Sequence, residues 1–236
     1  MANSLDLEEQ EQLDQIKHFW RAYGNLITWL ITLVLLAYAG WMGWQWWQRD
    51  QAGKAGGMFG ELDRAVQVGD LERSARVFGD LRERFPSTTY AAQAALLTAR
   101  LQADKGQLDA ARTTLAWAAD KSGDAEYRSI ARLRLAGVLM DQKKYDEALQ
   151  QLAGDVPPAF AALVADRRGD ILLAQGKRDA AVSAYQQAYK DMAPAVEYRR
   201  LVEAKLTALG AAPEPAAAAA AGTAASGSAA ARVGDR

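Results

Sequence analysis

The sequence holds 236 residues, with 28 basic and 29 acidic side chains and no cysteine. The near-neutral balance excludes the electrostatic footprint of a nucleic-acid-binding protein. The missing cysteines exclude disulfides, thiol catalysis and thiolate metal sites.

Residues 1–21 are predicted to form a short amphipathic leader helix. Leu13, Ile16, Phe19 and Trp20 recur at helical spacing, with acidic residues between them. We interpret this segment as a solvated leader whose last turn continues into the next element. The alternative is that the leader lies on the membrane surface or binds a cytosolic partner.

Residues 22–48 are predicted to be a transmembrane helix in contact with membrane lipid. These 27 residues carry no formal charge and lie between Arg21 and Arg49. The 22 residues from Leu26 to Trp47 would span ~33 Å as a helix, which is roughly the hydrocarbon thickness of a bilayer. The segment lacks the polar face that a helix in water needs. The residues expected to face lipid are Leu26, Trp29, Leu30, Leu33, Leu36, Trp41, Trp44 and Trp47.

A cleaved signal peptide is the competing interpretation of this stretch. Leu26 to Tyr38 could be its apolar region, and Ala37 and Ala39 have a cleavage-like spacing. However, the leader carries five acidic residues, and the apolar run continues past Ala39 into a cluster of tryptophans. We therefore predict an uncleaved anchor. Basic residues flank both of its ends, so charge alone does not orient it.

Residues 49–57 are predicted to be a linker, because Gly53, Gly56 and Gly57 should loosen the chain. Residues 58–209 show no strand signal, and alanine and leucine recur there at spacings of three and four. The fold class expected is therefore all-α, with one transmembrane helix followed by a domain of about 160 residues.

A repeat of 37, 37 and 33 residues organises this domain. Its turns are expected at Gly69-Asp70-Leu71, Gly106-Gln107-Leu108, Lys143-Lys144-Tyr145 and Gly176-Lys177-Arg178. A small residue follows each turn at Ser74, Ala111, Ala148 and Ala181. A large residue follows four places later at Phe78, Leu115, Leu152 and Tyr185. Three turns have a small residue seven places before them, at Ala99, Ala136 and Gly169. This pattern is close to the 34-residue tetratricopeptide unit and predicts a solenoid of helical hairpins.

The end of the chain is predicted to contain a capping helix and a tail. Residues 194–209 should form the last helix, which covers the open end of the stack. Residues 210–236 are rich in alanine but interrupted by proline, glycine and serine, and they offer no large apolar residue to bury. We expect a disordered tail.

No catalytic, cofactor or metal site is expected, and we predict that the protein is not an enzyme. The sole histidine, His18, lies at the edge of the apolar segment and is interpreted as an interfacial residue. Asp166 and Asp170 lie one helical turn apart and could suggest a metal or acid–base pair. Since Arg167 and Arg168 stand between them, a solvated or interaction face is the favoured interpretation.

A stack of hairpins offers a concave surface lined by the first helix of each pair. The repeat register directs toward it Gln93, Leu96, Arg100, Ala103, Ile130, Leu133, Met140, Leu163, Asp166, Asp170 and Leu173. Such a mixed surface suits an extended peptide or a partner helix, although Leu96 and Leu133 could equally be core. Tetratricopeptide domains can clamp a peptide carboxylate with a cluster of basic residues. We expect that cluster to be absent here, because only Arg100 lies near the position where it would be.

The chain resembles the YfgM-like family, the ancillary subunits of the bacterial Sec translocon. The resemblance rests on QLDQIKHFWRAYGN before the apolar segment, GWQWWQ at its end, and VADRRGDILLAQG in the repeats. It implies a single-span inner-membrane protein with a cytoplasmic N-terminus and periplasmic repeats. It also implies association with SecYEG, with a membrane-anchored periplasmic chaperone of the peptidyl-prolyl isomerase type, and with emerging secretory polypeptides.

Three functions therefore stand as hypotheses. The first is a non-enzymatic translocon accessory whose groove binds a chaperone or emerging polypeptides. The second is a membrane tether that sequesters a cytosolic stress-response regulator through residues 1–21. The third is a scaffold for envelope assembly or cell division.

Overall fold

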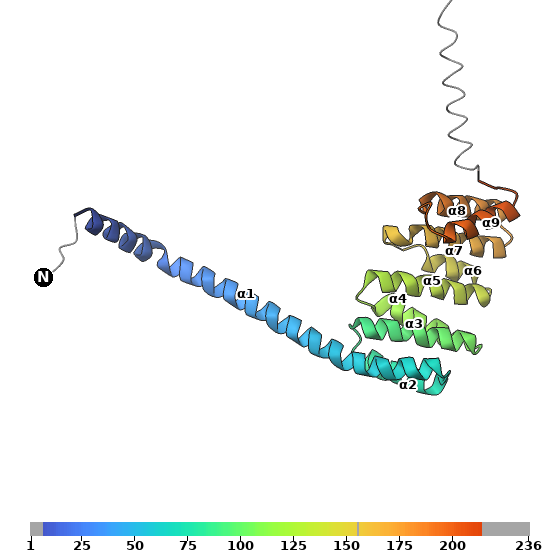
Figure 1. Ribbon diagram of the computed structural model, residues 1–236, viewed down its shortest axis with the longest axis horizontal. Coiled ribbons are helices and arrows are strands. Elements are labelled where there is room, and N and C mark those ends of the chain that lie inside the picture. Colours follow the sequence, from blue (N-terminus) through green and yellow to red (C-terminus); the bar gives the residue numbers. More distant parts are fainter. Residues whose placement is uncertain (1–6, 155, 214–236) are drawn as a thin grey trace, which may run out of the picture. The chain divides into compact units, whose positions relative to one another are not determined.

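The computed structural model describes residues 7–154 and 156–213, and across them it contains helices and no strand, which confirms the all-α prediction (Figure 1). In chain order the elements are α1 (Leu7–Gln67), α2 (Leu71–Arg84), α3 (Thr89–Asp104), α4 (Leu108–Lys121), α5 (Ala125–Asp141), α6 (Tyr145–Gln151), a 3-10 turn (Pro158–Phe160), α7 (Ala161–Ala174), α8 (Arg178–Asp191) and α9 (Tyr198–Ala208). The chain divides into two units at Lys54 and Ala55.

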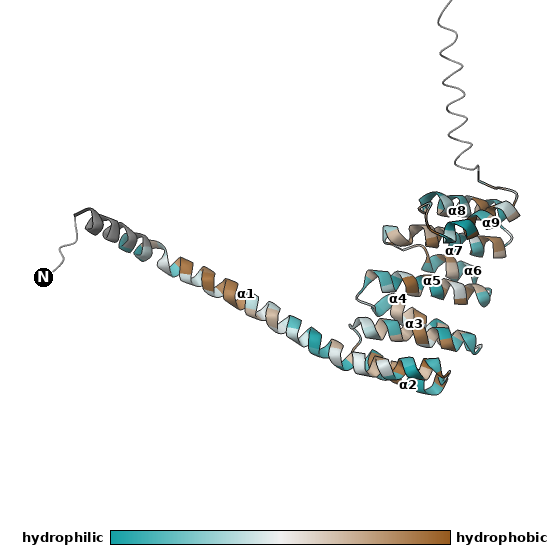
Figure 2. Ribbon diagram, viewed as in Figure 1, coloured by the Kyte–Doolittle hydropathy of each residue, from teal (hydrophilic) through white to brown (hydrophobic). Residues whose placement is uncertain are grey.

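The N-terminal unit contains most of helix α1, and Figure 2 shows the apolar part of this helix in brown. The large apolar side chains of this part are exposed. Within the described residues, one segment, in Trp20–Gln67, is long and apolar enough to cross a membrane, with a mean hydropathy of 1.8 and none of its apolar window buried by protein. All eight leucines and tryptophans expected to face lipid have exposed side chains. Thr28 and Thr32 donate their hydroxyls to the carbonyls of Gly24 and Thr28, both at 2.8 Å. Their polar groups are thereby satisfied inside the helix, as a bilayer requires.

Helix α1 continues without a break through residues 49–57, so the expectation that glycines loosen this segment is wrong. A glycine inside a helix costs only about 1 kcal/mol relative to alanine. Packing offsets that cost, because Ala55 and Leu62 are fully buried against the hairpins that follow. The C-terminal end of α1 thus serves as the first helix of the first hairpin.

The four predicted turns join successive helices as expected. Each contains one residue in the left-handed region, namely Gly69, Gly106, Lys143 and Gly176, with φ between 60° and 77°. At the first, the Asp70 amide donates to the Ala65 carbonyl at 2.9 Å and the Gly69 amide to the Val66 carbonyl at 3.0 Å. The same bond pair recurs at the other three turns. This Schellman arrangement satisfies the last carbonyls of a helix, which explains why glycine marks three of the turns.

The small and large residues of the repeat lie where the hairpin prediction places them. The four small residues after the turns are fully buried, and the large ones four places later, Phe78, Leu115, Leu152 and Tyr185, are at most 5% exposed. Gly169 shows why a small residue is needed, because a Cβ there would lie 2.5 Å from the Tyr185 ring. The hairpin repeat is therefore built on small-residue contacts between paired helices.

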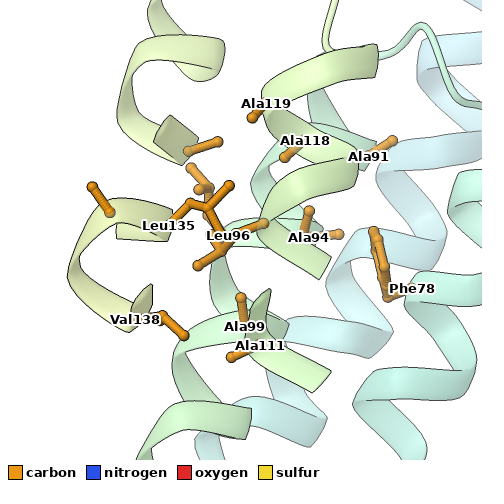
Figure 3. Packing of buried hydrophobic residues seen from close by; sticks show 14 of the residues in the cluster. Phe78, Ala91, Ala94, Leu96, Ala99, Ala111, Ala118, Ala119, Leu135 and Val138 are labelled. Carbon is orange, nitrogen blue, oxygen red and sulfur yellow. The ribbon is translucent and has the colours of Figure 1, made fainter. Parts of the chain in front are cut away.

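Two apolar clusters hold the hairpins together. The larger runs from the end of α1 to α7, and Figure 3 shows Leu96 of α3 and Leu135 of α5 pointing toward one another within it. Many of its members are alanines, so neighbouring helices approach closely. The smaller cluster joins α7, α8 and α9.

Helix α9 is the last helix that the structure describes, and it packs on α8 as the predicted capping helix. Val202 and Leu206 are its fully buried residues. The helix begins at Tyr198 and not at Pro194, because the chain first makes a turn in which the Val196 amide donates to the Ala193 carbonyl. Most of the predicted tail, residues 214–236, lies outside the described residues.

Candidate functional site

A pocket of about 430 Å³ opens between α3, α5 and α7, the first helices of three successive hairpins. The sequence pattern predicted a binding surface on these helices. We call it the arginine pocket, and its lining residues are Ala99, Arg100, Ala103, Asp104, Leu115, Arg134, Gly137, Val138, Met140, Asp141 and Arg167. Only Leu115 comes from a second helix, α4.

Three guanidinium groups dominate the chemistry of this pocket. Arg100, Arg134 and Arg167 each come from a different first helix. Arg134 and Arg167 each lie nine residues before the turn residue of their repeat, Lys143 and Gly176, so these two occupy equivalent places. Arg100 lies six residues before Gly106, about one helical turn further along its helix and therefore on the same helix face. Arg167 extends over α5 at Gly137, where a Cβ would lie 3.9 Å from its guanidinium carbon. The repeat thus brings Arg134 and Arg167 to one surface, and Arg100 lines the same pocket from a position one helical turn along its own helix.

Arg134 has no carboxylate partner within the part of the chain that the structure describes. Its Nη1 donates to the Leu96 carbonyl at 3.2 Å, which ties α5 to α3. Burial, followed by the positive charge of Arg100, lowers the pKa of the Arg134 guanidinium below its usual value. An arginine stays protonated at neutral pH despite such a shift, so the pocket retains a positive charge that is poorly compensated.

The other two arginines have loose ion pairs. Arg100 Nε lies 3.8 Å from Asp104 Oδ2, and Arg167 Nη1 lies 3.7 Å from Asp170 Oδ2. Charge-assisted hydrogen bonds between guanidinium and carboxylate groups are about 1 Å shorter, near 2.8 Å. Both guanidinium groups therefore keep N–H donors that a carboxylate ligand could engage.

Apolar side chains form the rest of the wall. Ala99, Leu115, Val138 and Met140 line the same pocket as the arginines. A ligand seated here would meet both an aliphatic surface and cationic donors. This combination suits a segment of polypeptide better than an inorganic ion.

The structure brings Arg100, Ala103 and Met140 of the predicted groove into the arginine pocket. Gln93, Leu96, Ile130 and Leu133 lie elsewhere on α3 and α5. The Gln93 amide donates to the Tyr127 hydroxyl, and Leu96 is buried in the core. Ile130 and Leu133 are half-buried and pack against the same core.

The two aspartates of the predicted groove are covered by α9. Asp166 is 2% exposed and accepts hydrogen bonds from the Tyr198 hydroxyl and the Lys205 ammonium, both at 2.8 Å. Asp170 accepts from Lys205 at 2.7 Å and from the Tyr185 hydroxyl at 2.8 Å. These carboxylates therefore join α7 to α8 and α9. Asp166 is closed to a ligand in this structure, whereas the Asp170 side chain is 21% exposed.

The tyrosines of this network are held as donors. Burial, followed by the hydrogen bond to Asp170, raises the pKa of Tyr185 well above its usual value. Burial and the hydrogen bond to Asp166 raise the pKa of Tyr198 in the same way. Both hydroxyls therefore stay protonated. Of the remaining predicted groove residues, Leu163 is half-buried beside the smaller cluster and Leu173 is exposed.

The sequence pattern predicted only Arg100 near this position, whereas the structure places three arginines at the pocket. The sequence prediction found Arg100 but missed Arg134 and Arg167. The 33-residue interval between Arg134 and Arg167 equals the interval between the turns at Lys143 and Gly176, and it could have placed these two residues on one surface, because positions one repeat apart face the same surface. The register does not relate them to Arg100. Among the described residues, no group of three histidine, cysteine, aspartate or glutamate side chains could hold a metal ion.

Comparison with known proteins identifies a matching family model and several relatives that share one name. The family model of a tetratricopeptide repeat-like domain matches residues 17–211. A protein of Neisseria gonorrhoeae named ancillary SecYEG translocon subunit is 32% identical over 204 residues, which cover 86% of this chain and 98% of that protein. Proteins of the same name from Haemophilus influenzae and Escherichia coli are 30% identical over 182 residues and 36% identical over 109 residues. These alignments cover 77% and 46% of this chain, and 89% and 53% of the respective relatives.

Proposed function

Since the chain belongs to the YfgM-like family of ancillary SecYEG translocon subunits, we propose that it is a non-enzymatic accessory of the Sec translocon, anchored in the inner membrane by α1. Its repeat domain holds a chaperone or polypeptides that emerge from the translocon. The site of this interaction is the surface of α3, α5 and α7 that contains the arginine pocket.

One observation carries the proposal. The matched family model spans residues 17–211, so it includes both the apolar segment of α1 and all the hairpins. The similarity therefore concerns the combination of an anchor and a helical repeat, and not the repeat alone, which occurs in many unrelated proteins.

Anchoring gives a physical reason for the combination. A tether confines the repeat domain to a thin layer beside the membrane, where its effective concentration toward other membrane-bound proteins reaches the millimolar range for a short link. A pocket of modest affinity can then be occupied by a chain that leaves the membrane nearby. The same pocket on an untethered protein would be largely empty.

The topology is part of the proposal. The N-terminus is placed in the cytoplasm and the repeats in the periplasm. The absence of cysteine from all 236 residues suits that oxidising compartment. The chaperone we expect at the repeats is a membrane-anchored peptidyl-prolyl isomerase, and the polypeptides are secretory chains.

The proposal is tested by solubilising membranes in a mild detergent and recovering the C-terminally tagged chain. SecYEG should be recovered with it in amounts above those obtained with an unrelated single-span protein carrying the same tag. Recovery of no SecYEG, under conditions in which the translocon itself stays assembled, would contradict the proposal.

A deletion variant distinguishes the translocon function from the alternative in which the leader tethers a cytosolic regulator. Deleting residues 2–16 removes most of the leader and leaves the apolar segment intact. The translocon proposal predicts unchanged recovery of SecYEG by this variant. A tether acting through the leader would lose its cytosolic partner instead.

A further inference from the structure

Three arginines from three successive helices meet at one pocket, and the described residues leave their charge incompletely paired. Arg134 contacts only a backbone carbonyl, and the pairs that Arg100 and Arg167 make with Asp104 and Asp170 are longer than 3.6 Å. Exposed pairs of this length contribute little to stability. The arrangement places like charges together, and none of the three guanidinium groups has a carboxylate of the described residues at hydrogen-bond distance.

The acidic residues of the pocket do not remove this excess. Asp104 and Asp141 also line it, against three arginines, so its lining carries one net positive charge. No carboxylate of the described residues lies within 4 Å of the Arg134 guanidinium, which is the middle cation of the three. A carboxylate from outside could accept charge-assisted hydrogen bonds from these arginines, and such bonds are about twice as strong as neutral ones.

The spacing of the arginines favours an extended chain over a single anion. First helices that pack side by side are 8–10 Å apart. In an extended polypeptide, side chains two residues apart face the same side and lie about 7 Å from one another. Carboxylates at such alternate positions can reach arginines of neighbouring helices, because the arginine side chains are long. The aliphatic residue beside them can rest on Val138 and Met140.

We propose that the arginine pocket binds an extended, acidic segment of polypeptide, with its carboxylates paired to Arg134 and to Arg100 or Arg167. This inference rests on the proposed function in one respect, which is that the surface of α3, α5 and α7 receives polypeptides. It adds the chemical class of the segment that is bound. A basic segment or a purely apolar one would be rejected, because it leaves the three cations unpaired.

The test measures the binding of fluorescein-labelled peptides to the full-length chain in nanodiscs of zwitterionic lipid, by fluorescence anisotropy. The probes are a blocked Ala-Asp-Leu-Asp-Leu-Asp-Ala peptide, the same peptide with asparagine for aspartate, and the same peptide with lysine for aspartate. The acidic peptide should bind at least about tenfold more tightly than the asparagine peptide, since two charged hydrogen bonds are lost. The lysine peptide should not bind.

The variants R134Q and R167Q should each weaken binding of the acidic peptide by roughly fivefold to tenfold. The matched control is R112Q, which makes the same change of charge at a residue that lines a different pocket, between α4, α5 and α6. It should leave the affinity unchanged. R167Q is informative even if R134Q unfolds the domain, because among the described residues Arg167 makes a single ion pair, with Asp170, which is as long as 3.7 Å. Circular dichroism of each variant verifies that the helices are retained.

Equal affinity for the acidic and asparagine peptides would overturn the inference, as would tighter binding of the lysine peptide or an equal effect of R112Q and R167Q. The recovery of SecYEG by R167Q distinguishes this failure from failure of the proposed function. If SecYEG is recovered but the acidic peptide is not preferred, only the chemical class of the ligand is wrong.

Discussion

Gly169 of α7 lies directly against the Tyr185 ring of α8. A Cβ at this position would lie between 2.5 and 2.9 Å from three atoms of the buried Tyr185 ring. We predict that Gly169→Ala lowers the free energy of unfolding by about 1–3 kcal/mol, because the ring cannot move away inside a packed cluster. Urea denaturation of the full chain in detergent, followed by circular dichroism, measures this change.

Gly79 provides the matched control for that substitution. It lies inside α2, and an added Cβ would meet nothing within 4 Å. Gly79→Ala should therefore raise the free energy of unfolding by about 0.5–1 kcal/mol, since alanine loses less backbone entropy in a helix. If both substitutions have the same sign, the close approach of α7 and α8 is not as the structure shows it.

The buried hydroxyl of Tyr185 should make the free energy of unfolding depend on pH in the alkaline range. Its hydroxyl donates to Asp170 at 2.8 Å, and burial raises its pKa above the unfolded value of 10.0. The unfolded chain therefore loses this proton at a lower pH than the folded chain does. The stabilisation is complete below pH 10 and decreases as the pH rises above it. We predict that the free energy of unfolding falls more steeply between pH 10 and 11.5 in the natural chain than in Tyr185→Phe.

The comparison at pH 7 completes this prediction. Tyr185→Phe removes one hydrogen bond to a charged acceptor, which contributes about 1.5–3 kcal/mol. The difference between the two proteins should therefore shrink as the pH rises above 10. A constant difference from pH 7 to 11.5 would show that the tyrosine hydroxyl does not stay protonated in the folded state.

At the scale of elements, one lysine of α9 forms ion pairs that link this helix to α7. Lys205 of α9 donates to both Asp166 and Asp170 of α7, at 2.7 to 3.0 Å. Lys205→Met would leave the buried Asp166 without a cation, and we expect a loss of about 3 kcal/mol in the free energy of unfolding. Urea denaturation of the full chain measures this loss.

Two further variants test the reason for this loss. Lys205→Met combined with Asp166→Asn removes both charges and should recover much of the lost stability. Lys190→Met, an exposed lysine of α8, should change stability by less than about 0.5 kcal/mol. If the double variant is no more stable than Lys205→Met, the loss does not come from an unpaired carboxylate.

The hairpins could be predicted from the sequence because their signals are local. Gly69, Gly106 and Gly176 take a left-handed conformation that few other residues adopt easily, and each lies within a few residues of the small and large positions it predicts. The turn at Lys143 has the same backbone without glycine and could be placed only through the period. The prediction of loosened backbone near Gly53 was wrong, because packing of the next turns maintains the helix.

The candidate site was harder to predict because it depends on distant residues. Asp166 is covered by Lys205, which is 39 residues away, so the repeat register alone directed it toward an open groove. Arg134 and Arg167 were missed because each looks like an ordinary solvated residue in its own helix. Alignment of the repeats pairs Arg134 with Arg167, but the structure is needed to show that both share a pocket with Arg100.

At the scale of the whole molecule, the absence of cysteine allows a direct test of the proposed topology. Glu72→Cys places the sole thiol of the chain on α2, at a side chain that is 89% exposed. A membrane-impermeant maleimide should label it in intact spheroplasts, because we place the repeats in the periplasm. Ser4→Cys, in the leader, should be labelled only after the membrane is opened. The reverse pattern would contradict the proposed orientation.

The central claim is that an anchored helical repeat holds polypeptides at the arginine pocket. It is tested most directly by photo-cross-linking from Met140, in membranes where a secretory chain has been stalled during translocation. Thr113, which is exposed on α4 and lines a different pocket, provides the control position. We predict that a photoreactive residue at 140 is cross-linked to the secretory chain or to a chaperone and that one at 113 is not. Cross-links from 113 alone, or equal yields from both positions, would contradict this account.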